Sequence, residues 1–307
     1  MGSIQFEVLI NDEFLSNLDS SFQAKDNEKV LSLVNDFEDG KWRITKFQNF
    51  IWDNIAETAL SKDERDKLSD QSHSKLIASA KNLRLTDKDG EMGKGSELAE
   101  ILLYGIMKHY YKALPIVPKI FYKQNSQDNA KGSDSVHLVI ENDNDFSIWL
   151  GESKFYKDLA SAMTEAIKSI KDALSTEKLK KENRIITGLR DIDGFLEDNI
   201  ELLNKIRDFL SNENSIDIFK PKLHIPILLL HECEKTKNST IMTEQYKKDL
   251  KIFHIQQAQV YFNKQINTIG TLSQYSEIKF HLILFPIPDK QQIVDKFICN
   301  VQFYKGQ

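Results

Sequence analysis

One segment, residues 132–156, limits what this chain can fold into more than any other. Two runs, residues 135–140 and 146–151, are rich in the β-branched and aromatic residues that favour strands. Between them, residues 141–145 read Glu-Asn-Asp-Asn-Asp, a composition typical of turns. The segment therefore predicts a β-hairpin.

The hairpin has an uneven distribution of side chains. Alternate residues of a strand point to the same side. The even-numbered side is apolar except at one end, where Asp134, Glu152 and Lys154 join Val136. If the turn is centred near Asn144, Asp134 lies opposite Lys154, and Val136 lies opposite Glu152, with directly opposed side chains about 5 Å apart. Two carboxylates and an ammonium then meet at the edge of an apolar sheet.

Charges in such a place are costly unless they pair or bind a metal. Carboxylates are ligands for Mg²⁺, and a bound Mg²⁺ polarises a phosphate and lowers the pKa of a bound water. A neighbouring lysine can orient that water and stabilise developing negative charge. The combination indicates a site for phosphodiester hydrolysis. A structural Asp–Lys–Glu ion-pair cluster is the alternative, and the residue types alone do not decide between the two.

A third acid is predicted on a helix that precedes the hairpin. Gly95-Ser96 is a good helix start with Ser96 as N-cap, and the following residues are mostly apolar, which predicts a buried helix. Its one polar stripe holds Glu97, Glu100, Tyr104, Lys108 and Tyr111. Glu97 is explained by its favourable interaction with the helix dipole. Glu100 lies one turn deeper, so we expect Glu100 to be the third acid, with Glu97 as its competitor.

The chain contains a helix with a Glu, then a Gly-x-Asp motif, then a Glu-x-Lys motif. This order of motifs resembles that of the PD-(D/E)XK nuclease superfamily. Residues 132–137 (Gly-Ser-Asp-Ser-Val-His) and 150–156 (Leu-Gly-Glu-Ser-Lys-Phe-Tyr) resemble more closely the HamA family, the nuclease subunits of bacterial Hachiman anti-phage systems. The close resemblance covers about residues 94–158. Ser133 stands where the superfamily name has a proline, a variation that the superfamily tolerates.

The resemblance implies a function and a set of site residues. Asp134, Glu152 and Glu100 would be metal ligands and Lys154 the catalytic lysine, with Mg²⁺ as cofactor and Mn²⁺ as an alternative. The function implied is a DNA nuclease effector that a helicase partner, HamB, holds inactive until it meets DNA. A self-sufficient restriction-type endonuclease is the alternative enzyme. A non-catalytic interaction subunit that keeps the nuclease fold is the alternative of another class, although the presence of all four key residues argues against it.

The charge pattern is consistent with a partner. The net charge is −5, whereas a protein that seeks DNA alone usually carries a strongly basic face. Positive charge is local: Lys157, Lys168 and Lys171 flank the predicted site and are candidate DNA contacts. A second basic cluster within residues 178–184 is interpreted as a solvated helix end.

Composition predicts a cytoplasmic enzyme. The 307 residues are 40% hydrophobic, which suffices for a sizeable core, and two cysteines provide no disulfide framework. No apolar run approaches the length of a membrane span, and the N-terminal residues do not resemble a secretory signal.

The order of elements predicts an α/β fold with a mixed central sheet flanked by helices. The resemblance implies that residues 91–307 form a PD-(D/E)XK restriction-endonuclease-like core, on which an N-terminal α+β extension of residues 1–90 packs. Pro226 predicts an edge or a bulge in its strand. Besides the hairpin, we expect strands at 4–10, 118–123, 223–231 and 278–285, and helices at 49–60, 62–83, 96–114, 159–174, 177–183, 190–209, 242–266 and 290–297.

Overall fold

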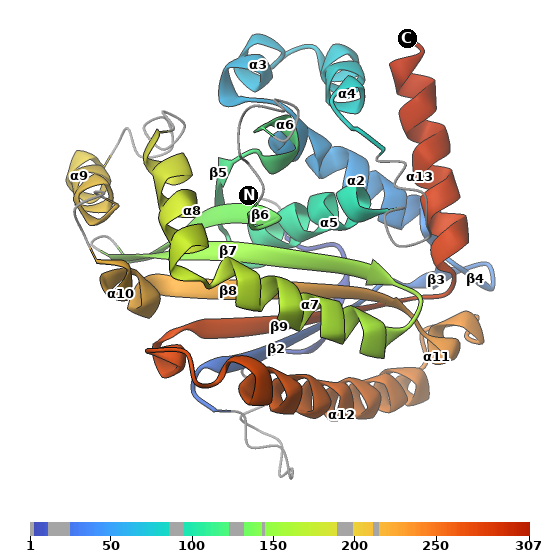
Figure 1. The fold of residues 1–307 in the computed structure, drawn as a ribbon. Coiled ribbons are helices and arrows are strands. Elements are labelled where there is room, and N and C mark those ends of the chain that lie inside the picture. Colours follow the sequence, from blue (N-terminus) through green and yellow to red (C-terminus); the bar gives the residue numbers. More distant parts are fainter. Residues whose placement is uncertain are drawn as a thin grey trace.

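The centre of the molecule is a seven-stranded mixed β-sheet with the strand order β1-β2-β9-β8-β7-β6-β5 (Figure 1). The computed structural model describes residues 3–11, 25–85, 95–122, 132–142, 145–188, 199–210 and 215–307. Strands β2, β9, β8 and β7 are parallel to one another, while β1, β6 and β5 pair antiparallel with their neighbours. The predicted α/β fold with a mixed sheet is confirmed. The seven strands are β1 (Glu7–Ile10), β2 (Glu28–Val34), β5 (Leu114–Val117), β6 (Ser135–Asn142), β7 (Asp145–Tyr156), β8 (Leu223–Glu232) and β9 (Lys279–Ile287).

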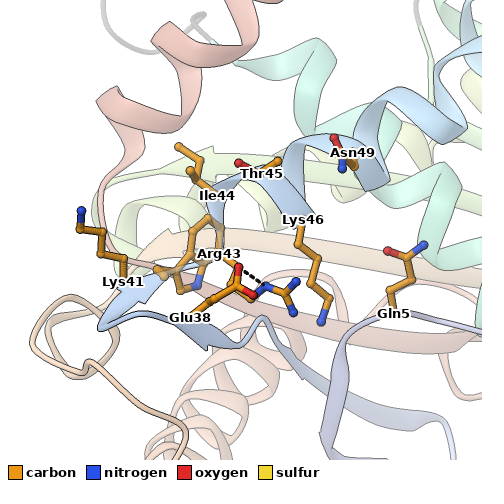
Figure 2. A pocket seen from close by; sticks show the side chains of 9 residues that line it. Gln5, Glu38, Lys41, Arg43, Ile44, Thr45, Lys46 and Asn49 are labelled. Atoms are coloured by element: carbon orange, nitrogen blue, oxygen red, sulfur yellow. Dashed lines mark ion pairs between the residues drawn. The ribbon is translucent and has the colours of Figure 1, made fainter.

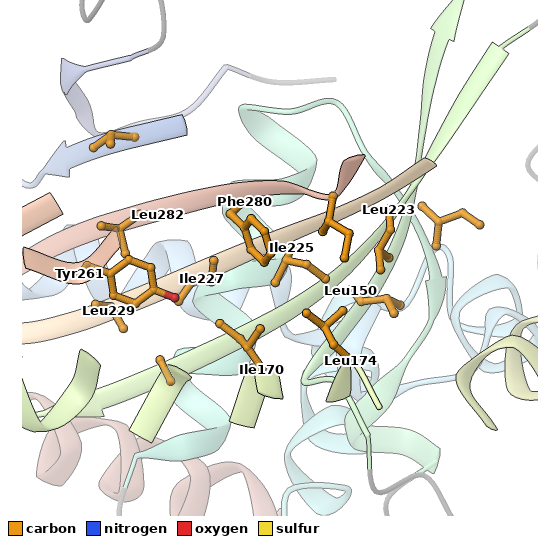
Figure 3. Packing of buried hydrophobic residues seen from close by; sticks show 14 of the residues in the cluster. Leu150, Ile170, Leu174, Leu223, Ile225, Ile227, Leu229, Tyr261, Phe280 and Leu282 are labelled. Carbon is orange, nitrogen blue, oxygen red and sulfur yellow. The ribbon is translucent and has the colours of Figure 1, made fainter. Parts of the chain in front are cut away.

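Helices cover both faces of this sheet (Figure 1). One face packs against α7 and α12, and Figure 3 shows Leu150 of β7 beside Ile170 of α7, with Tyr261 of α12 over the neighbouring strands. The other face packs against α2, α5 and α13, where Trp149 and Phe155 of β7 join the apolar cluster. Each fully buried Leu, Ile or Phe contributes about 1.5–3 kcal/mol. The helices are α2 (Ile44–Ala59), α3 (Lys62–Lys67), α4 (Ser72–Lys81), α5 (Ser96–His109), α6 (Lys119–Tyr122), α7 (Leu159–Ala173), α8 (Thr176–Gly188), α9 (Ile200–Phe209), α10 (Ile216–Phe219), α11 (Glu234–Lys237), α12 (Glu244–Ile269) and α13 (Lys290–Lys305).

The N-terminal part shares the central sheet with the rest of the chain. Strand β2 pairs along its length with β9, starting with Glu28 opposite Phe280. Helix α2 packs against α5, the helix that precedes the hairpin. After β2, a small two-stranded sheet of β3 (Phe37–Glu38) and β4 (Lys41–Trp42) leads into α2. The division of the chain at residue 90 stays a prediction.

The hairpin of β6 and β7 forms with the predicted sidedness but in a different register. Ser135 lies opposite Gly151 and Val136 opposite Leu150, so the expected pairing of Val136 with Glu152 is wrong by two residues. A two-residue shift keeps every side chain on its predicted face. The pairing is irregular between Ile140 and Asn142, next to the turn. Because of this irregularity, the position of the turn does not determine which residues of the two strands lie opposite each other.

Several local expectations are corrected. Residues 119–122 form the short helix α6 and not a strand, and the strand lies just before it as β5, with Pro115 inside. Gly95, with φ of +94°, is the N-cap of α5 instead of Ser96. The strand expected at 278–285 extends to Ile287 as β9, with Pro286 inside it. The predicted helix at 190–209 is present from Ile200 as α9, and its first part lies outside the described residues.

Pro226 lies in an inner strand, not at an edge. Strand β8 pairs with β7 on one side and β9 on the other, and Pro226 is opposite His281 of β9. The β7–β8 pairing passes from Trp149 opposite His224 directly to Glu152 opposite Ile227. The sheet thus accommodates a residue without an amide N–H through a local interruption of the ladder.

None of the helices in the described ranges combines the length and the apolar character needed to cross a membrane. The longest, α12, has 26 residues and carries charged and amide side chains along its length.

Candidate active site

The structure brings Asp134, Glu152 and Lys154 together at the end of the hairpin. The amide of Asp134 donates to the carbonyl of Gly151 at 2.8 Å, which fixes Asp134 beside β7. Its Oδ2 accepts the amide of Ser153 at 2.9 Å and the Ser153 hydroxyl at 3.1 Å. Asp134 therefore bonds to Ser153 of β7, just beyond the end of the β6–β7 pairing. Ser153 lies between Glu152 and Lys154, the two other residues predicted for the site.

Glu152 is a buried carboxyl with an ion pair on one side. It is 8% exposed, its carboxylate accepts from the ammonium of Lys154, and Ser169 of α7 donates a hydrogen bond to it. Burial and the negative charge of Asp134 raise the pKa of Glu152 to about 8. Burial alone would lower the pKa of Lys154, but the charges of Glu152 and Asp134 outweigh it and raise that pKa. The site is thus an electrostatically coupled group of two carboxyls and one ammonium.

A glycine makes the approach of neighbouring strands possible at this point. A Cβ added to Gly151 would lie 2.1 Å from the hydroxyl of Ser135, 2.8 Å from Leu103 of α5 and 3.3 Å from Pro226. A side chain at residue 151 would therefore push β6, α5 and β8 away from β7, immediately before Glu152. The glycine of the sequence motif thus has a packing role.

The two helix acids have different environments. Both carboxylate oxygens of Glu97 accept backbone amides, from Arg84 at 2.8 Å and from Leu85 at 2.9 Å. Glu97 therefore anchors the segment before α5. Glu100 is 5% exposed, one turn further into a helix whose neighbouring residues are fully buried. These contacts account for Glu97 without a metal and leave Glu100 as the preferred third ligand, which stays a prediction.

Helix α5, which carries Glu100, and the side chain of Glu152 lie on different faces of the sheet. Helix α5 packs on the face of Trp149 and Phe155, and Gly95 at its start lies against the Phe155 ring. Glu152 points to the opposite face, toward Ser169 of α7. Within the described ranges, no three His, Cys, Asp or Glu side chains are grouped so that they could hold a metal ion. The structure thus groups Asp134 with Glu152 and Lys154, while the role of Glu100 as a third metal ligand stays a prediction.

The donor chemistry of Asp134 and Glu152 nevertheless fits Mg²⁺. This ion is usually held by one or two carboxylates, with waters and substrate phosphates completing its shell. The repulsion that Asp134 exerts on Glu152 is the interaction that a divalent cation between them would relieve. No third protein ligand is needed for this mode of binding.

The three lysines predicted to contact DNA are exposed. Lys157 follows β7, while Lys168 and Lys171 lie on the outer side of α7, the helix whose Ser169 contacts Glu152. Lys168 is 3.9 Å from Glu165, a long contact that leaves its ammonium largely in solvent. Their role in DNA binding stays a prediction.

A separate pocket of about 360 Å³ lies at the start of α2 (Figure 2). Lys41, Arg43 and Lys46 line it, but Arg43 pairs with Glu38 at 3.4 Å, and Asp36 lies 3.2 Å from both Arg43 and Lys46. Its lining residues come from the first strands and α2 and include none from the hairpin. Because the acids compensate most of its positive charge, we assign it no part in the site.

Sequence reasoning missed three residues that contact the site or the turn before it: Ser153, Ser169 and Glu182. Ser153 is the variable position of the Glu-x-Lys motif, and Ser169 is one of many polar residues on an amphipathic helix, so neither carried a signal. Glu182 lies in the lysine-rich stretch for which the sequence predicts a solvated helix end. In the structure it is 2% exposed and ion-paired with Lys119, which is fully buried.

Together, a mixed sheet between two helical layers and a hairpin bearing two carboxyls and a lysine define an α/β protein with a nuclease-like core. The family model for HamA matches residues 9–301 of the 307. The chain therefore belongs to the HamA family, and membership supports a role as a component of a Hachiman defence system. Neither the comparison with curated proteins nor that with solved structures gave a match.

Proposed function

We propose that this chain is the Mg²⁺-dependent DNA nuclease of a Hachiman system, restrained by a helicase partner until that partner engages DNA. The observation that carries the proposal is the grouping of Asp134, Glu152 and Lys154 at one end of the hairpin, in a HamA family member. The helicase is proposed from the family resemblance alone.

The residues have separable roles. Asp134 and Glu152 would hold the ion, with Glu100 as the proposed third acid. When bound, Mg²⁺ supplies polarisation of the scissile phosphate and a water of lowered pKa. The ammonium of Lys154 donates hydrogen bonds to the attacking water and to the negative charge that develops on the phosphate. Ser153 and Ser169 keep the two carboxyls in place.

A plasmid assay with four mixtures tests the proposal: the chain alone and the chain with its helicase, each with Mg²⁺ and with EDTA, all in the presence of ATP. We expect cleavage only with the helicase and Mg²⁺. Cleavage by the chain alone that the helicase does not change would favour the restriction-type alternative. No cleavage in any mixture, from a folded complex, would favour a non-catalytic interaction subunit.

Two glutamine substitutions should separate the helix acids. Glu100→Gln should reduce cleavage at least 10-fold with little change in melting temperature, because it removes a charge from a proposed ligand. Glu97→Gln should keep cleavage and cost about 1 kcal/mol of stability, because it weakens the hydrogen bonds to the amides of Arg84 and Leu85. Rates and thermal unfolding of both variants give the ranking, and the reverse ranking would make Glu97 the ligand.

Charge reversal on α7 tests the proposed DNA contacts. Lys171→Glu should weaken DNA binding. It should also make the dependence of log K, the association constant, on log salt less steep by about 1, as expected when one phosphate contact is lost. Lys248→Glu, at an exposed position on α12, is the matched control. Binding of a fluorescent duplex at several salt concentrations measures both. Equal slopes for the two variants would remove Lys171 from the interface.

A further inference from the structure

We propose that Glu182 of α8 is a positioning residue that holds the Gly132–Ser133 turn, and through it Asp134, in the geometry of the site. The proposal rests on the proposed nuclease function and extends it to a helix outside the sequence motifs. Glu182 is 49 residues from Ser133 in the chain but accepts its backbone amide at 2.8 Å through Oε1.

A buried ion pair fixes the carboxylate of Glu182. The Nζ of Lys119 lies 3.0 Å from Oε1 and 2.8 Å from Oε2, and the side chains are 0% and 3% exposed. Two charges removed from water in this way retain one arrangement, because any other would leave a buried charge uncompensated. The acceptor presented to Ser133 is therefore rigid.

The turn itself is shaped to meet this carboxylate. A Cβ on Gly132 would lie 1.7 Å from Oε1 of Glu182, so no side chain fits at residue 132 while Glu182 keeps its position. The next amide, that of Asp134, bonds to Gly151 of β7. The turn is thus held by α8 at Ser133 and by β7 at Asp134, which explains why glycine precedes the acid in the Gly-x-Asp motif.

Lys119, the basic residue of the ion pair, is connected by hydrogen bonds to α5, the helix that carries Glu100. The amide of Lys119 donates to the hydroxyl of Tyr104 at 3.3 Å, and that hydroxyl donates to the carbonyl of Val117. Tyr104 lies one turn after Glu100 on α5. One connected set of contacts therefore links α5, the β5–α6 corner, α8 and Asp134. Its function would be to keep the helix acid and the hairpin acid in a constant relation.

Two double variants isolate the hydrogen bond from the ion pair. Glu182→Gln alone leaves the Lys119 ammonium buried without its counter-ion and risks misfolding. Lys119→Met with Glu182→Gln removes both charges but keeps an oxygen for the Ser133 amide. Lys119→Met with Glu182→Met has nearly the same volume and lacks that oxygen. The two proteins differ only in the acceptor. Glu57→Gln, which removes the negative charge from the 2.5 Å contact with Lys108, is a control for losing an ion pair elsewhere.

We expect both double variants to melt within a few degrees of each other. The Met/Met variant should need about 10- to 100-fold more Mg²⁺ or cleave about 10- to 100-fold more slowly than the Met/Gln variant, the usual effect of losing a contact that orients a ligand. Amide hydrogen exchange at Ser133 and Asp134, measured without metal or DNA, should be at least 10-fold faster in the Met/Met variant.

Equal exchange at these two amides in both double variants would overturn the positioning role, whatever the activity. Faster exchange together with equal cleavage and equal Mg²⁺ dependence would also overturn it, since the turn would then be irrelevant to the site. If the wild-type complex does not cleave DNA, the proposed function fails, while the exchange comparison still decides whether Glu182 holds the turn.

Discussion

Replacing Lys154 by Met should lower Mg²⁺-dependent cleavage by about 100- to 1,000-fold, the effect of removing one preorganised donor from a developing oxyanion. The fold should persist. The Lys154 side chain is 19% exposed, and its partner Glu152 already has its pKa raised to about 8, so the loss of the ammonium leaves a carboxyl that can stay neutral. Glu152→Gln should show a comparable loss, because it replaces a proposed metal ligand by an uncharged amide of nearly the same shape.

Lys222→Met is a suitable control for Lys154→Met. Lys222 pairs with Asp145 at the other end of β7, so the same substitution breaks an ion pair on the same strand. Single-turnover cleavage at saturating Mg²⁺, with the helicase and ATP present, would measure the chemical step. If Lys154→Met cleaves at the rate of Lys222→Met, the lysine of the motif is structural and the ion-pair alternative holds.

Acidification should destabilise this protein by several kcal/mol between pH 7 and 5. Burial lowers the pKa of His137 to about 3 and of His224 and His231 to about 4, and lowers those of His254 and His281 well below the ordinary value of 6.5. Because the unfolded chain binds these protons first, the stabilisation is fully present above about pH 6.5 and is lost as the pH falls toward 4. Each fully buried histidine accounts for about 2 kcal/mol over this interval.

Protonation of Glu152 favours the folded state as the pH falls, and it offsets part of the stability lost through the histidines. Its raised pKa means that the folded protein, not the unfolded chain, takes up the proton between about pH 8 and the ordinary value of 4.5. The net fall in the free energy of unfolding is measured by urea unfolding at a series of pH values. Constant stability from pH 7 to 5 would contradict the neutral, buried state of the histidines.

His137→Phe isolates one histidine from the rest. His137 is fully buried against the ring of Tyr104, with 4.5 Å between centroids, and neither of its ring nitrogens has a hydrogen-bond partner among the described residues. Phenylalanine should therefore keep or increase the stability at pH 7 and remove about 2 kcal/mol of its loss between pH 7 and 5. Asn54 hydrogen-bonds the more exposed His109, so His109→Phe serves as the comparison.

The sequence predicted the sidedness of the hairpin because sidedness is local. Alternation of apolar residues assigns each side chain to a face, and Val136, Leu138, Ile148 and Leu150 are buried as expected. The register depends on the geometry of the turn and its irregularity near Ile140, which composition does not specify. The expected grouping is present because a shift by two residues keeps Glu152 and Lys154 on one face, and Asp134 bonds to Ser153 between them.

Features that depend on contacts distant in the chain could not be predicted. A lysine-rich helix reads as solvated, so nothing in residues 178–184 indicated that Glu182 would be buried against Lys119. Pro226 predicted an edge or a bulge, but it lies in an inner strand, where the β7–β8 ladder is interrupted beside Gly151. The face on which α5 packs, and therefore the position of Glu100 relative to Glu152, also depends on the tertiary arrangement.

The place of β9 in the sheet has a consequence for synthesis of the protein. Strand β9, the last of the described strands in chain order, lies between β2 and β8, and it pairs with Glu28 on one side and with His224 on the other. Until residues 279–287 emerge, β2 and β8 each present an unpaired edge, and unpaired edges recruit other chains. Premature termination upstream of β9 should therefore give an insoluble product and not a soluble, partly folded chain.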